Sequence, residues 1–132
     1  MDTVLFACVH NAGRSQMAAA YFNALANPAK ARAISAGTQP GTAVHPVVLE
    51  AMQEVGIDLS NVQPQRLTEA LAAQAVLLIT MGCGESCPYV PGLKVEDWPL
   101  EDPKGRPMEE VRRIRQDVMG RIIDLLRRED WT

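Results

Sequence analysis

The sequence predicts an α/β domain in which a four-stranded parallel sheet carries helices on both faces. The 132 residues have the length of one ordinary domain, so we expect residues 1–132 to fold as a single unit. Short apolar runs alternate along the chain with longer segments in which apolar residues recur every three or four positions. Strands separated by helices favour right-handed crossovers and therefore a parallel sheet.

The first half of the chain is expected to form two strand–helix pairs. Val4 to Ala7 is a continuous apolar run, which is typical of a strand buried on both faces. The helix that follows ends before Pro28, and Gly56 is suited to end the second helix. In order, the predicted elements are a strand at 4–7, a polar turn at 9–14, a helix from Ser15 to about Asn27, a strand at 32–35 and a helix at 47–55.

The second half of the chain is expected to add two strands and two helices. Residues 75–80 (AVLLIT) are the most strand-like run, and Pro107 suits a first helical turn. The last helix has apolar residues that step by three and four, while its arginines alternate with acids and are expected on a solvated face. In order, the predicted elements are a short helix at 67–73, a strand at 75–80, a long loop at 82–92, a strand at 94–98 and a helix at 107–128.

The composition argues against several classes of protein. Hydrophobic residues make up 47% and charged residues 22% of the chain, which is the balance of a globular domain. The net charge of −3 argues against a nucleic-acid partner, and no apolar run approaches the length of a membrane span. The apolar run Val4–Val9 is too short for the core of a signal peptide, so a cytoplasmic location is expected.

The segment after the first strand, Cys8 to Ser15 (CVHNAGRS), has the composition of an oxyanion site. Ligands of parallel sheets bind at the carboxyl ends of the strands, and N–H groups that curl into a helix N-terminus lack partners. Arg14 offers a planar fork that matches a tetrahedral oxyanion, and Gly13 permits the tight curl. The residues expected to bind the anion are Val9, His10, Asn11, Ala12, Gly13 and Arg14.

Cys8 lies beneath the same electropositive loop, which favours a reactive thiolate. Ser15 could donate its hydroxyl to this thiolate or stabilise it as a leaving group. The alternative interpretation is a buried structural cysteine with a capping serine and a surface arginine. Three such residues at this spacing, between a strand and a helix, favour the oxyanion site.

A nucleophile that attacks an oxyanion also needs a proton for the departing oxygen. Asp102, followed by Pro103, is the best candidate because it lies in a proline-framed loop after the predicted fourth strand. Asp97 and Glu101 are competitors of lower rank. Without the neighbouring oxyanion site, the alternative of a solvated acidic loop would be preferred.

Together these motifs resemble the low-molecular-weight tyrosine phosphatase fold family, and the resemblance covers essentially the whole chain. The motifs are residues 4–17 (VLFACVHNAGRSQM), 35–38 (SAGT) and 102–103 (DP). Residues 47–59 (VVLEAMQEVGIDL), 79–83 (ITMGC) and 87–88 (CP) resemble its arsenate reductase branch, of the thioredoxin-coupled type. The resemblance implies a low-molecular-weight phosphatase-like sheet, Cys8 as nucleophile, Arg14 as oxyanion clamp and Asp102 as acid.

The number of thiols separates a reductase from a phosphatase. Hydrolysis of a phosphate ester needs one thiolate, one acid and water, whereas reduction of arsenate to arsenite takes two electrons, which two thiols supply by forming a disulfide. Cys83, beyond the third strand, is placed to attack Cys8, and Cys87 can then take over the disulfide and pass it to a reductant. The chain has three cysteines, which matches a Cys8/Cys83/Cys87 relay that serves arsenic detoxification.

Several alternatives remain open for the later cysteines and for the activity. Cys83 and Cys87 could be incidental packing residues, or a metal pair that no further Cys or His cluster completes. The activity could be that of a phosphatase acting on phosphotyrosine or small phosphate esters, or the domain could be a non-catalytic oxyanion-binding or arsenic-sensing module. Against the phosphatase, the chain has only two Tyr and two Phe that could line a pocket for a phosphotyrosine ring. Against the non-catalytic module, a protein that only binds an oxyanion needs no proton donor such as Asp102.

The partners follow from the resemblance and from its departures. Arsenate is the expected substrate, with phosphate as a competing oxyanion. Only three residues separate Cys83 from Cys87, fewer than in the best-known thioredoxin-coupled members. Thioredoxin is the first choice of reductant, and a low-molecular-weight thiol with a glutaredoxin-like protein is the rival. Ala19 stands where some members have a potassium-binding glutamate, so no potassium site, other metal or cofactor is predicted.

Overall fold

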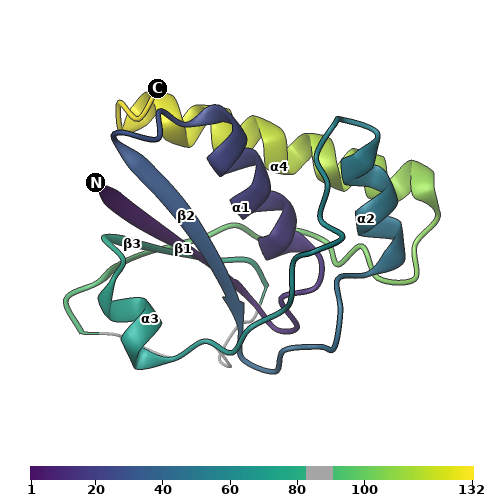
Figure 1. Ribbon diagram of the computed structural model, residues 1–132, viewed down its shortest axis with the longest axis horizontal. Coiled ribbons are helices and arrows are strands. Elements are labelled where there is room, and N and C mark those ends of the chain that lie inside the picture. Colours follow the sequence, from purple (N-terminus) through teal and green to yellow (C-terminus); the bar gives the residue numbers. More distant parts are fainter. Residues whose placement is uncertain (83–90) are drawn as a thin grey trace.

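The computed structural model describes residues 1–82 and 91–132, which form the predicted α/β fold (Figure 1). Its strands are β1 (Asp2–Cys8), β2 (Ala31–Gly37), β3 (Leu77–Thr80) and β4 (Lys94–Asp97), in the spatial order β2-β1-β3-β4. Every neighbouring pair of these strands is parallel. The predicted four-stranded parallel sheet is therefore confirmed.

The strand order reverses at β1, which lies between β2 and β3. The chain passes from β1 to β2 on one side and then crosses to β3 on the other, and ligands of such sheets bind at the carboxyl ends beside this reversal. The register keeps the strand ends level, because Ala7 of β1 lies opposite Thr80 of β3, and Thr80 lies opposite Asp97 of β4. The segments that follow β1, β3 and β4 thus begin at one edge of the sheet.

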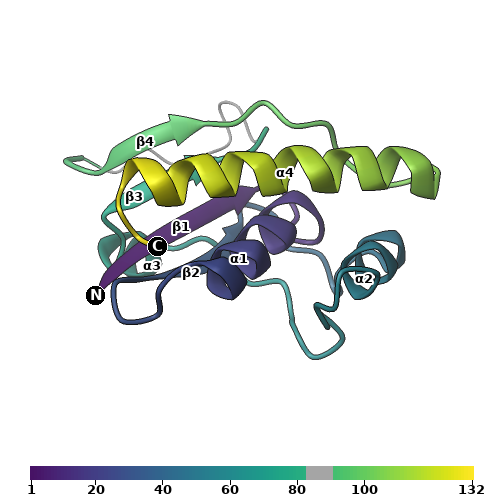
Figure 2. The ribbon, with the colours of Figure 1, turned by 90° about the horizontal axis from the view of Figure 1, so that it is seen from above.

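Helices cover the two faces of the sheet unequally (Figure 2). One face carries α1 (Arg14–Leu25), α2 (Pro46–Gln53) and α4 (Met108–Arg128), and the other carries the short α3 (Glu69–Ala73). Side chains of β1 alternate accordingly: Phe6 and Cys8 join the large cluster beneath α1 and α4, whereas Leu5 joins a small cluster with Ala72 of α3. The Cys8 side chain therefore lies on the α1 side of the sheet.

No helix within the described residues combines the length and the apolar character needed to cross a membrane.

The bounds of several elements differ from the predicted ones. β2 continues through Gly37 because its pairing with β1 extends to Cys8, and β3 begins at Leu77 rather than two residues earlier. α2 ends at Gln53, so Val55 lies beyond the helix with 41% of its surface exposed. Pro107 is the N-cap of α4 and not part of its first turn.

The expected solvated position is wrong for one arginine of α4. Arg115 is only 9% exposed, and its Nη1 donates to the Ala51 carbonyl and to Glu54 Oε1, each at 2.7 Å. Arg112 binds the same carboxylate, with Nη2 at 2.7 Å from Glu54 Oε2. Hydrogen bonds from Arg112 and then Arg115 lower the pKa of Glu54 to about 2. These contacts tie the end of α2 to α4.

Replacement of Phe22 by alanine should destabilise the fold strongly. Phe22 is fully buried, and its ring lies 6.0 Å from the Phe6 ring and 5.7 Å from the Trp131 ring. Loss of a buried phenyl ring costs about 3–5 kcal/mol of unfolding free energy, which urea denaturation followed by circular dichroism would measure. Leu25→Ala is a matched control, because Leu25 belongs to the same helix but is 46% exposed. Its cost should stay near 0.5 kcal/mol, about the usual size for a surface change, and equal losses in both variants would contradict this packing.

Candidate functional site

The loop Cys8–Arg14, called here the anion loop, has its carbonyl oxygens engaged by the neighbouring chain. A segment at residues 38–45, called here the strap, runs beside it. The N–H groups of Thr38, Gln39, Gly41 and His45 donate to the carbonyl oxygens of Cys8, Val9, His10 and Ala12, at N···O distances of 3.3, 2.8, 2.9 and 2.9 Å. The carbonyl of Asn11 accepts from Gln16 Nε2 at 3.0 Å, and that of Gly13 accepts from the Met17 N–H at 3.0 Å. Every carbonyl from Cys8 to Gly13 is therefore satisfied within the protein.

Among the described residues, the N–H groups of the anion loop have no such partners. Within residues 1–82 and 91–132, no acceptor takes the backbone N–H of any residue from Val9 to Arg14. The loop leads directly into α1, whose N-terminus adds partial positive charge. A loop with free donors and satisfied acceptors at a helix N-terminus is suited to bind an oxyanion.

Cys8 is held at the base of this loop by the Ser15 side chain. Cys8 is 2% exposed, and its Sγ lies 2.9 Å from Ser15 Oγ. Asn11 Nδ2 donates to the same hydroxyl oxygen at 2.8 Å. Because Ser15 Oγ accepts from Asn11, its own proton is free to point at the Cys8 sulfur. This arrangement lets the Ser15 hydroxyl donate a hydrogen bond to the Cys8 sulfur.

Asn11 has a role in the anion loop that sequence reasoning missed. Its backbone has a φ of 50°, the left-handed conformation that asparagine tolerates better than most residues. Its side-chain Oδ1 accepts from Gln16 Nε2 at 3.1 Å and from the Gln65 N–H at 2.9 Å, which fixes the direction of Nδ2. An asparagine in a tight loop was the available signal, but the contact with Gln65 spans 54 positions of sequence and leaves no local pattern.

Gly13 serves a different purpose from the one predicted. Its φ is −143°, so the left-handed turn belongs to Asn11. A Cβ atom on Gly13 would lie 2.9 Å from Cγ of Pro103, closer than real side chains approach. Gly13 is therefore required for the close contact between the anion loop and the segment that carries Asp102.

Arg14 is oriented by the segments that follow β3 and β4. Its Nη1 donates to the Leu100 carbonyl at 3.1 Å, and its Nη2 lies 3.8 Å from Asp102 Oδ2. Gly82, with a φ of 93°, packs so closely against Nη1 that an added Cβ would overlap it. The guanidinium is thus directed from two sides, and its side chain is 10% exposed.

Asp102 is better placed than either acidic competitor. Asp97 accepts a hydrogen bond from Thr80 Oγ1 at 2.7 Å, which occupies its carboxylate at the end of the sheet. Glu101 is paired with Arg113 at 2.9 Å. The Asp102 carboxylate instead faces Arg14, and 45% of its side chain is exposed.

The two histidines lie at the margin of the site. His10 Nδ1 lies 3.0 Å from the Gln39 carbonyl on the strap, in an exposed contact. His45 is the N-cap of α2. Burial lowers the pKa of His45, and the nearby Asp102 carboxylate only partly opposes this.

Cys83 and Cys87 lie outside the described residues, so their contacts stay a prediction. The described chain enters that segment at Gly82, beside Arg14. Within residues 1–82 and 91–132, no three His, Cys, Asp or Glu side chains lie close enough together to hold a metal ion.

Comparison with known proteins gives consistent matches over nearly the whole chain. Residues 3–130 match the family model described as "Low molecular weight phosphotyrosine protein phosphatase". A putative arsenate reductase of Halobacterium salinarum is 37% identical over 124 residues, which cover 91% of this chain and 87% of that protein. The glutaredoxin arsenate reductase of Synechocystis sp. is 35% identical over 129 residues, which cover 96% and 97%.

One solved structure adds a match in three dimensions. The thioredoxin-dependent arsenate reductase of Corynebacterium glutamicum is similar with a TM-score of 0.81 and 39% sequence identity. The match covers 96% of this chain, and this chain spans 61% of the Corynebacterium protein.

Arg14→Lys should weaken oxyanion binding although it keeps the charge. An ammonium group cannot reproduce the two parallel hydrogen bonds of the guanidinium fork or its contact with the Leu100 carbonyl. We expect the dissociation constant for inorganic phosphate, measured by isothermal titration calorimetry, to rise about tenfold, or roughly 1.4 kcal/mol. Arg66→Lys, which changes an exposed arginine on the strap side, is the control. Unchanged phosphate affinity in Arg14→Lys would place the oxyanion elsewhere.

Proposed function

The chain belongs to the low molecular weight phosphotyrosine protein phosphatase family, and we propose that within this family it is an arsenate reductase with Cys8 as its nucleophile. The observation that carries the proposal is the anion loop, in which a buried Cys8 sulfur lies beside the Ser15 hydroxyl and the N–H groups from Val9 to Arg14 have no acceptor among the described residues. Relatives with 35–37% identity over more than nine-tenths of the chain are named arsenate reductases, which supports this choice of substrate.

The first chemical step joins Cys8 to arsenic. The Cys8 thiolate attacks the arsenic atom of hydrogen arsenate, the bond from arsenic to its hydroxyl group breaks, and Asp102 gives this hydroxyl a proton, so that it leaves as water. Arg14 and the N–H groups of the anion loop hold the remaining oxygens and stabilise their charge. Arsenic is still pentavalent in the resulting Cys8 adduct, so no reduction has yet occurred.

The second and third steps move two electrons to arsenic and renew Cys8. The Cys83 thiolate attacks the Cys8 sulfur, the S–As bond breaks, and its electron pair stays on arsenic, which leaves as arsenite. Cys87 then attacks the Cys83 sulfur of the Cys8–Cys83 disulfide and releases Cys8 as a thiolate. The relay ends with a Cys83–Cys87 disulfide, which an external dithiol reduces.

We assign the last reduction to thioredoxin, with a low-molecular-weight thiol and a glutaredoxin-like protein as the rival. The Corynebacterium relative is named a thioredoxin-dependent arsenate reductase, which supports thioredoxin. The Synechocystis relative is named a glutaredoxin arsenate reductase, which supports the rival. Both reductants belong to the cytoplasm, where thiols are kept reduced, so a cytoplasmic location fits the cycle.

Turnover of arsenate with a dithiol reductant is the experiment that tests the proposed function. The protein is incubated with arsenate and reduced thioredoxin, and released arsenite is counted per enzyme; a parallel sample receives p-nitrophenyl phosphate. Repeated arsenite release supports the reductase. Ester hydrolysis without arsenite release would instead make the protein a phosphatase, and arsenate binding with neither reaction would make it a non-catalytic module.

Cys87→Ser should release one arsenite per enzyme and then stop. Cys83 can still attack Cys8, but nothing removes the resulting Cys8–Cys83 disulfide from its place beside the buried anion loop. Peptide mass spectrometry after alkylation should find that disulfide in the variant and a Cys83–Cys87 disulfide in the wild type. Cys8→Ser is the control and should release no arsenite, because loss of a covalent nucleophile costs orders of magnitude in rate. Normal cycling of Cys87→Ser with thioredoxin would refute the relay.

Asp102→Asn should slow the formation of the Cys8 adduct by about 100-fold, the usual scale for loss of a general acid. Rapid-quench measurement of a single turnover isolates this step from the later disulfide exchanges. Asp97→Asn is the control, because Asp97 is occupied by Thr80 and should leave the step almost unchanged. An unchanged first step in Asp102→Asn would move the proton donor to another group.

A further inference from the structure

We propose that Arg106 is a positioning residue that holds Asp102 over the anion loop. The inference rests on the proposed function, because it assumes that Asp102 supplies a proton there. Arg106 touches neither Cys8 nor Arg14 in any described contact, so it acts through Asp102 alone.

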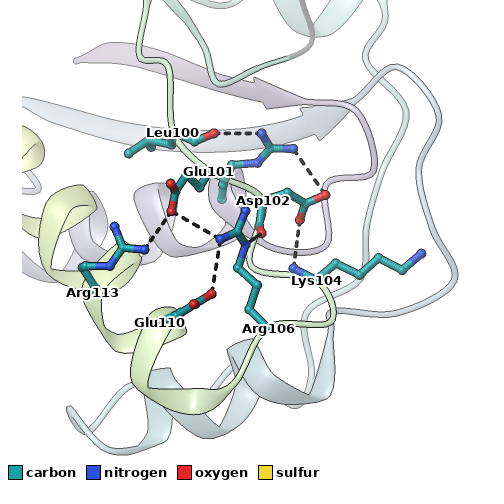
Figure 3. A network of polar contacts seen from close by, with 8 residues as sticks. Leu100, Glu101, Asp102, Lys104, Arg106, Glu110 and Arg113 are labelled. Carbon is teal, nitrogen blue, oxygen red and sulfur yellow. Dashed lines mark hydrogen bonds and ion pairs between the residues drawn. The ribbon is translucent and has the colours of Figure 1, made fainter.

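The Arg106 side chain joins the backbone of Asp102 to two carboxylates (Figure 3). Its Nε donates to the Asp102 carbonyl at 2.7 Å, the shortest of its contacts. Its Nη1 lies 3.2 Å from Glu110 Oε2, in the first turn of α4, and 3.5 Å from Glu101 Oε2. The guanidinium therefore connects the residue that carries the proton to the start of a 21-residue helix.

The turn around Asp102 has local order but needs this outside anchor. The Lys104 N–H donates to Asp102 Oδ1 at 3.0 Å, and the Arg106 N–H donates to the Pro103 carbonyl at 3.2 Å. Gly105 has a φ of 73°, as the third residue of such a turn requires. These bonds fix residues 102–106 relative to one another, but not relative to the anion loop.

Besides the Arg14–Asp102 pair, two contacts place the turn as a whole. On one side, Pro103 lies against Gly13 so closely that no Cβ fits between them. On the other side, Arg106 attaches the turn to α4. If the Arg106 contacts are removed, the turn can pivot on Pro103, and the half-exposed Asp102 carboxylate loses its fixed distance from Arg14.

A role in stability explains this arrangement poorly. The side chains of Arg106, Glu101 and Glu110 are 35%, 49% and 43% exposed, and ion pairs with such exposure add little to global stability. A charge-assisted hydrogen bond to the Asp102 carbonyl, by contrast, acts directly on the position of one side chain. Proton transfer requires the acid to lie within hydrogen-bond reach of the departing oxygen, so a small displacement lowers the rate steeply.

Arg106→Met, which keeps most of the side-chain length without its donors, tests the proposal. Arg113→Met is the matched control, because Arg113 pairs with the same Glu101 at 2.9 Å but has no contact with Asp102. We expect Arg106→Met to slow formation of the Cys8 adduct by about tenfold to 100-fold, the cost of a misplaced catalytic group. Phosphate affinity and the melting temperature should stay close to those of the wild type, and Arg113→Met should change none of the three.

A double-mutant cycle shows whether Arg106 acts through Asp102. In the Asp102→Asn background the acid is already lost, so Arg106→Met should cause no further decrease in the first step. Three results would each overturn the proposal. They are a double variant whose first step is slowed by the product of the two single effects, a parallel loss of phosphate affinity in Arg106→Met, and an equal effect of Arg113→Met.

A measurement without turnover separates this inference from the proposed function. A crystal structure of Arg106→Met should show the Asp102 carboxylate displaced from its 3.8 Å contact with Arg14, whereas Arg113→Met should keep that contact. If the wild type releases no arsenite, the proposed function fails, while a displaced carboxylate in Arg106→Met still supports the positioning role. An unchanged position of Asp102 in Arg106→Met would overturn the positioning role whatever the protein reduces.

Discussion

The outward engagement of the anion loop's carbonyl oxygens is the constraint on which the rest of the site depends. A loop of peptide groups has as many acceptors as donors, so it attracts an anion only if its acceptors are satisfied elsewhere. The strap supplies four of the required donors, and Gln16 and Met17 supply two more. The strap follows β2 directly and ends at the N-cap of α2. The capacity of these seven consecutive residues to bind an anion therefore depends on the segment after β2 and on the first turn of α1.

Close approach between segments is the second requirement, and glycine provides it where the carboxyl ends of the strands meet. Gly37 lies so near the anion loop that an added Cβ would be 2.6 Å from the Val9 carbonyl oxygen. Gly13 admits Pro103, and Gly82 admits the Arg14 guanidinium. Because the strands are parallel and in register, the segments after β1, β3 and β4 all begin at this edge. The Cys8 sulfur, the Arg14 guanidinium and the Asp102 carboxylate, the three groups that the proposed function uses, therefore come from these segments and not from one motif.

The sequence could predict what local pattern and contiguous motif encode. Periodicity predicted all eight helices and strands of the described residues, and the run from Cys8 to Ser15 predicted a candidate oxyanion-binding loop. Asp102 is the predicted proton donor because its proline-framed loop follows a strand, and this role stays a prediction. The sequence did not predict roles that depend on distant partners or on the backbone. Asn11 is held by Gln65, and Arg106 donates to a backbone carbonyl that any residue could supply. Arg115 has the same spacing as the solvated arginines of α4, and only the approach of α2 buries it.

The burial of Cys8 gives a reason for a second thiol within the same chain. Arsenate reduction involves two successive events at one sulfur, namely its attack on arsenic and then the attack of another thiol on it. The first event benefits from a shielded and oriented sulfur, and Cys8 is 2% exposed beneath the anion loop. The same shielding hinders any external thiol in the second event. On the proposed function, Cys83 would avoid this conflict, because it follows Gly82 in the sequence and Gly82 lies against Arg14. On the proposed function, a later cysteine could then carry the disulfide outward, so that the buried nucleophile never has to be reached by a protein reductant.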